Sequence, residues 1–386
     1  MKNLLIGITL LILFSCSSNP KNTYGTNFEE SLILKPQINY KLNSLPKDIN
    51  VLYFTNPGNK NELTEEVKGL LTNYYSFSKK YSYFPRIKLF RLDQLNTCSY
   101  ILNRNTFNVV FLLNDTLDYK FYESCLNRIN NQNALFVVDS FNKNLFNNFR
   151  NFSVDRNQDK YRLLKFMNSS SNSVIVIDNE VTKDKYEIGK YWETNFKKEV
   201  TEYRTFNKSE SSEKLFSNLL LSEQSIKRNR RLSRIISKGI EHNPRTREDI
   251  DALFLSVNTQ EARSLKPALD YVYIEGMKVF LANDWKENII FNKTDKDLEN
   301  VISIDIPFML QTPLPEELDD IKNKTRNFAI GYDSFEIVLL LKGAKNLNKI
   351  TYKGLTGNIT FREKDIERKS TIFKIQNGSY KYLNDI

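Results

Sequence analysis

Two patterns of apolar and polar positions alternate along the chain, one typical of β-strands and the other of α-helices. Short apolar runs rich in β-branched residues, typical of buried strands, lie at 50–54, 108–112 and 134–138. The stretches 62–77 and 119–129 show the spacing of helices. Strands that alternate with helices predict βαβ units and a mostly parallel sheet, so this first series indicates the α/β class.

A second series of the same kind follows. We predict strands at 173–177, 199–206, 252–257, 278–281 and 301–304, and helices at 161–167, 185–196, 213–240 and 259–273. In the last helix we expect Thr259 to be the N-cap and Pro267 to break or kink the helix at Lys266. Two series suggest two lobes with a cleft between them. Lobe 1 is expected mainly at 49–145 and lobe 2 mainly at 160–300, with a C-terminal segment that crosses between the lobes.

The N-terminus has the parts of an export signal. A positive head, Met1-Lys2-Asn3, precedes an apolar run at 4–14. This run is shorter than the roughly 20 residues that a membrane-spanning helix needs. Its end, Leu13-Phe14-Ser15-Cys16, resembles a bacterial lipobox, which predicts a signal peptide at 1–15 and a diacylglycerol-bearing Cys16. The alternative is an ordinary signal peptide followed by a chance cysteine.

The residues after Cys16 predict where the chain is held. Ser17, in place of Asp, resembles the sorting pattern that sends lipoproteins to the outer membrane. Residues 16–48 are rich in Asn, Ser, Lys and Pro without a sustained period, so we expect a flexible tether. About 30 flexible residues reach roughly 30 Å. The predicted location is the outer membrane, lipid-anchored and facing the periplasm.

The charge balance raises the question of partners. The 386 residues carry 56 Lys and Arg against 46 Asp and Glu, a formal charge of +10. An exported chain does not meet nucleic acid, so the explanations are anionic head groups, an acidic partner, or solubility alone. Six cations gather near the end of the predicted helix 213–240: Lys227, Arg228, Arg230, Arg231, Arg234 and Lys238. A solvated basic face and a docking surface for an acidic partner or phospholipid both stay open.

The chemistry of an enzyme is hard to assemble from this sequence. His242 is the only histidine, and the three cysteines include Cys16, so we expect no metal site. No Gly-rich phosphate loop or nucleophile elbow appears in the sequence. We therefore predict no catalytic residue and no cofactor. Cys98 and Cys125 either form a disulfide or remain buried free thiols.

A dense charge cluster precedes the predicted strand 252–257. Arg245, Arg247, Asp249 and Asp251 lie at the amino end of this strand. Ligands of open α/β sheets lie at the carboxyl ends of the strands, so pairing of these charges in a structural role is favoured over ligand contact.

Several ordered blocks resemble the LppC family of outer-membrane lipoproteins, which are penicillin-binding protein activators. The blocks are 247–255 with 258–267, 305–310, 328–335, 355–361 and the closing strand with Asn377-Gly378. The resemblance extends from about residue 150 to 380. Better-known members carry an N-terminal tetratricopeptide-like helical domain, whereas here the expected tether leads directly into the α/β pattern.

The resemblance implies both a fold and a function. The family's C-terminal domain is similar to type 1 periplasmic binding proteins, which have two α/β lobes linked by crossovers. Members bind a class A penicillin-binding protein and stimulate peptidoglycan synthesis without catalysing a reaction. Residues with an expected partner or structural role are Arg245, Arg247, Asp249, Asp251, Lys266, Pro267, Asp305 and Pro307. The polar loop 55–59 shows no clear amino-acid-binding pattern, so we expect an empty or repurposed cleft. The alternative function is that of a small-molecule receptor or of a transporter's substrate-binding lipoprotein.

Overall fold

The structure is a computed structural model of the chain. It describes residues 40–54, 62–92, 106–113, 126–127, 129, 133–138, 150–154, 156–239, 241–242, 244–272, 277–282, 296–311, 313–321, 324–344, 347, 350–362 and 365–383. The predicted signal peptide, Cys16, Cys98, Cys125 and most of the predicted helix 119–129 lie outside these residues.

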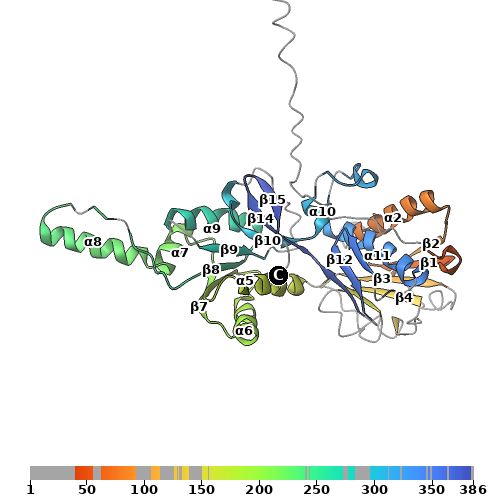
Figure 1. Ribbon diagram of the computed structural model, residues 1–386, viewed down its shortest axis with the longest axis horizontal. Coiled ribbons are helices and arrows are strands. Elements are labelled where there is room, and N and C mark those ends of the chain that lie inside the picture. The colour runs from red at the N-terminus through yellow and green to blue at the C-terminus, as the bar shows by residue number, and fades with distance from the viewer. Residues whose placement is uncertain are drawn as a thin grey trace, which may run out of the picture.

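The first sheet has eight strands in the order β11-β12-β13-β5-β4-β3-β1-β2 (Figure 1). Its strands are β1 (Asp48–Tyr53), β2 (Arg86–Arg91), β3 (Phe107–Leu112), β4 (Ala134–Val138), β5 (Asn151–Ser153), β11 (Thr351–Gly354), β12 (Gly357–Phe361) and β13 (Asp365–Lys369). Pairing is parallel from β2 to β13 and antiparallel among β11, β12 and β13. The helices α2 (Glu65–Tyr81) and α11 (Arg326–Gly343) pack together on one face, where Val67, Leu70 and Ile337 join the apolar core.

The second sheet has seven strands in the order β15-β14-β10-β9-β8-β6-β7. Its strands are β6 (Val174–Asn179), β7 (Val200–Phe206), β8 (Ala252–Ser256), β9 (Lys278–Leu281), β10 (Ile302–Asp305), β14 (Thr371–Gln376) and β15 (Ser379–Tyr382). The helices α5 (Arg156–Asn168) and α6 (Lys185–Phe196) pack on one core, and α7 (Ser212–Leu219) and α9 (Thr259–Val272) on another. The β14–β15 hairpin turns at Asn377-Gly378, where both φ angles are positive, as a type I′ turn requires.

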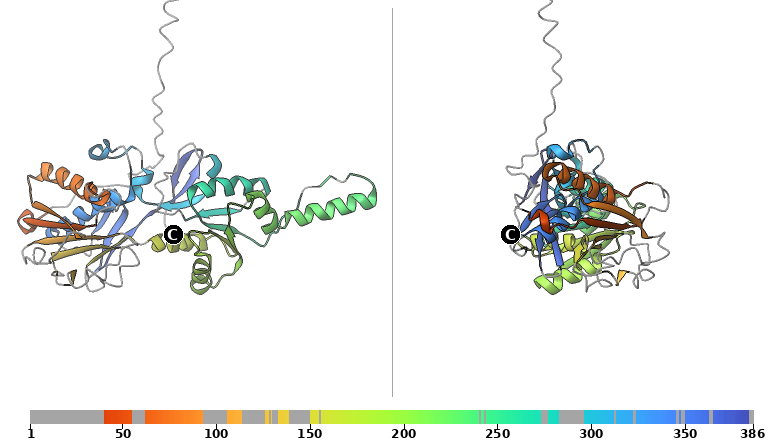
Figure 2. Two further views of the ribbon diagram at one scale, coloured as in Figure 1. Left: turned by 180° about the vertical axis from the view of Figure 1, so that it is seen from behind. Right: turned by 90° about the vertical axis from the view of Figure 1, so that its right-hand side faces the viewer.

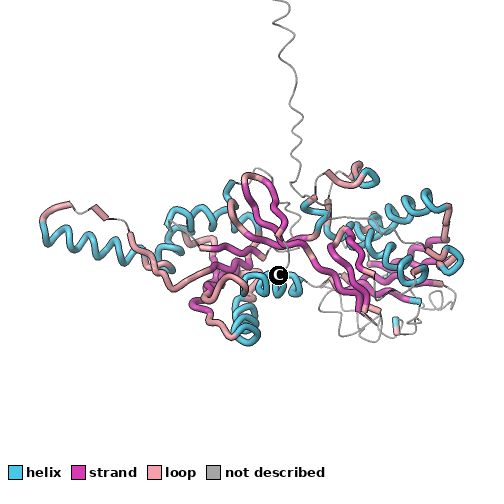
Figure 3. Tube along the Cα trace, in the orientation of Figure 1, coloured by secondary structure: helices cyan, strands magenta, loops and turns pink. Residues whose placement is uncertain are grey.

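The chain passes between the sheets three times. It leaves the first sheet after β5, returns after β10 through α10 (Pro307–Leu310), and leaves again between β13 and β14. The two sheets with their helices form two groups along the long axis of the molecule (Figures 2 and 3). The predicted two-lobed α/β fold with mostly parallel sheets is confirmed.

The strand β2 was not predicted, because its residues have the pattern of an exposed edge strand. All six residues are exposed or half-buried, and three of them, Arg86, Lys88 and Arg91, are basic. Such a sequence has no apolar run to mark it. Residues 40–47, which we assigned to the tether, pack against α11: the Lys41 amide donates to the Gly343 carbonyl at 3.1 Å, and Leu45 is buried. The packed part of the chain therefore begins before residue 49.

The predicted long helix 213–240 is wrong, because the chain forms two helices there. The helix α7 buries Leu215, Phe216 and Leu219, whereas α8 (Ser222–Ile236) buries only Ser222. Leu221 separates them with a φ of 60°, so the backbone turns and α8 leaves the core.

Of the two outcomes predicted at Lys266, a break or a kink, the break does not occur. The helix α9 continues through Pro267, since Leu265 and Leu269 on either side of it pack into the same core. Asn258 and not Thr259 caps this helix, because its Oδ1 accepts the Glu261 amide at 2.7 Å.

Candidate functional site

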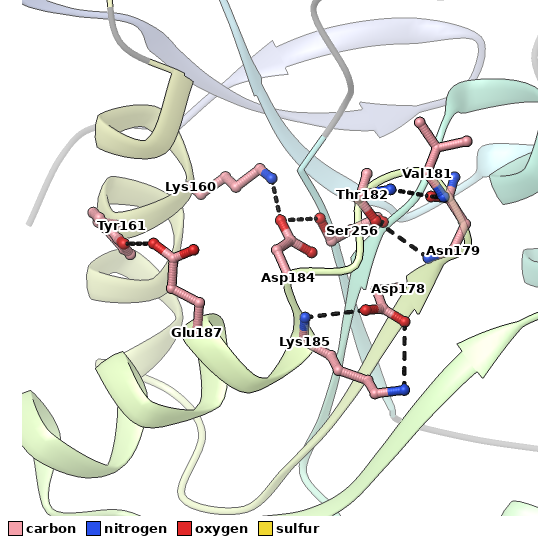
Figure 4. Close-up of polar contacts among 10 residues, drawn as sticks. All are labelled: Lys160, Tyr161, Asp178, Asn179, Val181, Thr182, Asp184, Lys185, Glu187 and Ser256. Atoms are coloured by element: carbon pink, nitrogen blue, oxygen red, sulfur yellow. Dashed lines mark hydrogen bonds and ion pairs between the residues drawn. The ribbon is translucent and has the colours of Figure 1, made fainter. Parts of the chain in front are cut away.

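The carboxyl ends of parallel strands are where this class of fold binds ligands. Both β5 and β10 end where the chain crosses between the lobes, so the carboxyl ends of both sheets face the crossover region. In the second lobe the polar contacts of Figure 4 join the ends of β6 and β8, the loop between β6 and α6, and the helices α5 and α6. Residues 55–61, 93–105 and 114–125, which follow β1, β2 and β3 in the chain, lie outside the described residues.

The end of β6 anchors the loop that follows it. An Asp178 carboxylate oxygen accepts the Lys185 amide at 3.1 Å at the start of α6, and the Lys185 ammonium lies 3.8 Å from the other oxygen. Asn179 accepts the amides of Val181 and Thr182 at 3.0 and 2.7 Å. Its own amide donates to Glu261 on α9 at 2.6 Å, so the loop is tied to two helices.

Asp184 lies between three elements at the same edge. It accepts hydrogen bonds from Lys160 of α5 and, at 2.9 Å, from the Ser256 hydroxyl at the end of β8 (Figure 4). The Thr182 hydroxyl donates to the Ser256 carbonyl at 2.8 Å. Asp184, Thr182 and Ser256 are thus engaged in hydrogen bonds with neighbouring groups of this edge.

Two buried ion pairs join elements across the crossovers. Arg326 at the start of α11 donates to Asp305 at the end of β10, with Nη2 2.6 Å from Oδ2, and each side chain is 3% exposed. Arg368 of β13 pairs with Asp159 of α5 at 2.9 Å. Buried charges cost free energy when they lose their partner, so these pairs hold the connections in place.

Asp333 forms a further buried polar centre in the first lobe. It accepts the Leu355 amide at 2.9 Å, the Thr356 amide at 2.7 Å and the Thr356 hydroxyl at 2.6 Å. Burial raises the pKa of Asp333 to about 6, against the lowering effect of these hydrogen bonds. A Cβ at Gly354 would lie 2.6 Å from its carboxylate, so the approach requires glycine there.

Sequence reasoning gave Asp333 no role, although a signal was present. Asp333 is an acid inside the largely apolar stretch 328–335, and its partners Leu355 and Thr356 lie in the separate block 355–361. Two of the blocks on which the family resemblance rests therefore meet at this carboxylate.

The predicted site residues do not form one site. Arg247 and Asp249 pair at 2.7 Å at the amino end of the second sheet. This pairing and Glu202 at 3.5 Å hold the pKa of Arg247 above its usual value, with the hydrogen bond to Asp249 as the larger effect. Asp251 accepts the amides of Asn172 and Ser173 at 2.7 and 3.2 Å.

The other predicted residues lie elsewhere. The exposed Arg245 donates its amide to the Ser225 hydroxyl, which also lies 3.1 Å from His242 Nε2. Lys266 pairs with Asp270 on α9, beside Pro267. Pro307 is the first residue of α10, two residues after Asp305. These residues are therefore spread over the sheet edge, α8, α9 and the crossover.

The described residues show neither a metal centre nor a membrane span. No group of three or more His, Cys, Asp or Glu side chains among them is arranged to hold a metal ion. Within the same residues, every helix is too short or too polar to cross a bilayer.

Sequence comparison relates the C-terminal half of the chain to a known family. Residues 188–378 match the family model described as LppC putative lipoprotein. A curated relative, the penicillin-binding protein activator LpoA of Vibrio cholerae, is 26% identical over 151 residues. This alignment covers 35% of the chain and 24% of the relative, so the chain matches about a quarter of the relative's length.

Solved structures share the fold at low identity. Full-length LpoA from Haemophilus influenzae has a TM-score of 0.59 at 13% identity, over 90% of this chain and 60% of that one. The LpoA C-domain from the same organism, described as a regulator of PBP1A, has a TM-score of 0.57 at 14% identity, over 87% of this chain and 100% of that one. A putative branched-chain amino acid ABC transporter protein from Chromobacterium violaceum scores 0.53 at 15% identity, over 84% and 98% of the two chains. With the match over residues 188–378, the chain carries a domain of the LppC family.

Proposed function

We propose that the chain is an outer-membrane lipoprotein, anchored through acylated Cys16, that binds and activates a class A penicillin-binding protein. The observation that carries the proposal is the match of residues 188–378 to the LppC family model. The curated relatives that match are named penicillin-binding protein activators. The partner is thus a peptidoglycan synthase, and the protein acts by contact and not by turnover.

The geometry of the described residues supports a function that depends on contact with a partner protein. The polar groups at the edge of the second lobe pair with one another, as Asp184 does with Lys160 and Ser256. The buried pair of Asp305 and Arg326 holds the connection between the lobes. Together these features favour a rigid body that presents its surface to a partner.

Crosslinking in living cells of the source bacterium tests partner and compartment together. The expected result is a covalent complex between the chain and a class A synthase in the outer-membrane fraction. A Cys16→Ser variant controls for the anchor and is expected to lose acylation and the membrane fraction. Recovery of the protein in the cytosol, or crosslinks that contain no synthase, would contradict the proposal.

A second candidate function is a small-molecule receptor. The likeness to the Chromobacterium violaceum transporter protein, which spans 98% of that chain, favours it. A receptor at a ligand concentration of about 100 times Kd gains about 2.7 kcal/mol of stability. A thermal-shift screen with amino acids, muropeptides and sugars therefore separates the two functions, because an activator without a ligand shows no shift.

A further inference from the structure

The helix α8 forms an arm that leaves the body of the protein. It projects from the end of the second lobe, beyond β8 and β9 and away from the first lobe (Figure 1). Only Ser222 of its fifteen residues is buried. At its base the Ser225 hydroxyl accepts the Arg245 amide at 3.0 Å, and the Arg247 amide donates to the Leu220 carbonyl at 3.0 Å. The arm is thus held at its root and exposed along its length.

Three large apolar side chains lie exposed on this arm. Leu232, Ile235 and Ile236 are 45%, 70% and 55% exposed. Their positions i, i+3 and i+4 place them on one side of the helix. Burial of such side chains in the monomer would stabilise the fold, so their exposure together marks an interaction face.

Arginines border the apolar side chains. Arg228 and Arg231 each precede an apolar residue, Leu232 and Ile235, by four positions and therefore lie beside them. Among the described residues, Arg228, Arg230, Arg231 and Arg234 make no ion pair, whereas Lys227 pairs with Glu223 at 2.7 Å. The face is therefore a short apolar row with unneutralised positive charge around it.

The charge and composition of α8 indicate which kind of partner binds it. A second copy of the chain would bring like charge against like charge, because the whole chain carries +10. Helices that lie in a membrane surface carry Trp, Phe or Leu on the apolar side, and the apolar row of α8 has one leucine, two isoleucines and no aromatic residue.

We propose that α8 is the docking element for the synthase, and that Leu232, Ile235 and Ile236 enter an apolar groove bordered by carboxylates on that partner. This inference rests on the proposed function and identifies the surface through which it acts. An amphipathic helix with anchors at i, i+3 and i+4 is a recurring mode of groove recognition, and arginine forms bidentate pairs with carboxylates.

The test measures the Kd of the full mature protein for each purified class A synthase of the source bacterium. The variants are Arg228→Glu with Arg231→Glu for the charge, and Ile235→Asn for the apolar anchor. The control is Lys165→Glu with Lys190→Glu, which changes the net charge equally at exposed lysines of α5 and α6 in the same lobe. All of these side chains are exposed, so unfolding midpoints are expected to match that of the unchanged protein.

We expect both arm variants to weaken binding by about tenfold or more, and the control by less than about twofold. Equal binding by the arm variants would overturn the docking role and leave the proposed function standing. If the unchanged protein binds no class A synthase, the proposed function fails and this inference with it. If the arm variants lose binding to phosphatidylglycerol vesicles but keep synthase binding, the arm recognises lipid and the proposal is overturned.

Discussion

Arg326 at the start of α11 and Asp305 at the end of β10 form an ion pair of 2.6 Å that is almost fully shielded from water. The strand β10 belongs to the second lobe and α11 to the first, so the pair joins the two lobes. Asp305 also accepts the Ile306 amide at 2.7 Å, so the chain direction at the crossover is set by this carboxylate.

Loss of one partner of this pair is expected to be costly. An Arg326→Leu variant leaves Asp305 buried without its cation, and we expect a loss of about 3–5 kcal/mol in the free energy of unfolding. The double variant with Asp305→Leu as well is expected to recover part of it, because no buried charge remains. Urea unfolding measures both, and a single-variant loss below about 1 kcal/mol would show that the pair does not hold the crossover.

The pair of Arg247 and Asp249 at the sheet edge is expected to contribute less to stability than the buried pair of Arg326 and Asp305. Asp249 is 59% exposed at its side chain, and pairs in contact with solvent contribute at most about 1 kcal/mol. An Asp249→Asn variant is expected to change the unfolding free energy by less than that amount. Urea titrations in low and high salt check this, and a loss as large as that of Arg326→Leu would contradict it.

The helices α2 and α11 approach each other at glycine. A Cβ at Gly331 would lie 1.7 Å from the Glu66 carbonyl oxygen, and one at Gly69 would lie 1.9 Å from the Phe328 carbonyl oxygen. Gly331→Ala is expected to cost about 3 kcal/mol, because the contact is with backbone that cannot rotate away. Gly239→Ala is the matched control, since nothing lies within 4 Å of its Cβ, and its unfolding midpoint is expected to stay nearly unchanged. Equal midpoints for both variants would mean that the helices can separate freely.

The raised pKa of Asp333 predicts a pH dependence of stability. Its ordinary value is 3.8 and burial raises it to about 6, so the folded protein binds this proton more tightly than the unfolded chain. The resulting stabilisation is present below about pH 4 and is lost as the pH rises through about 6.

An Asp333→Asn variant removes this titration. Between pH 7 and pH 5, we expect the unfolding free energy of the unchanged protein to rise by about 1 kcal/mol relative to the variant. Unfolding curves of both proteins across this range measure the difference. Parallel pH profiles would show that Asp333 does not titrate there.

Elements with an apolar run were predictable from the sequence. The strand β4 and the helix α6 begin and end where their patterns do, because β4 buries alternate side chains in two cores and α6 buries Ile188 and Trp192 in a third. The edge strand β2 was missed since it has no such run. The division between α7 and α8 depends on where the core ends, which periodicity alone does not show.

The polar centres were less accessible to sequence reasoning. Arg247 and Asp249 are near neighbours in the chain, so their pairing followed from local charge. Asp305 and Arg326 are 21 positions apart, and Asp159 and Arg368 are 209 apart, so only the fold brings them together. The exposed face of α8 needed the structure too, since the sequence shows the cations but not that the helix leaves the body.

The rate of glycan synthesis and crosslinking by a purified class A synthase, with and without the purified protein, tests the central claim most directly. The account predicts a severalfold rise that saturates with added protein and that weakens in the Arg228→Glu, Arg231→Glu variant. An unchanged rate with every class A synthase of the source bacterium would contradict it.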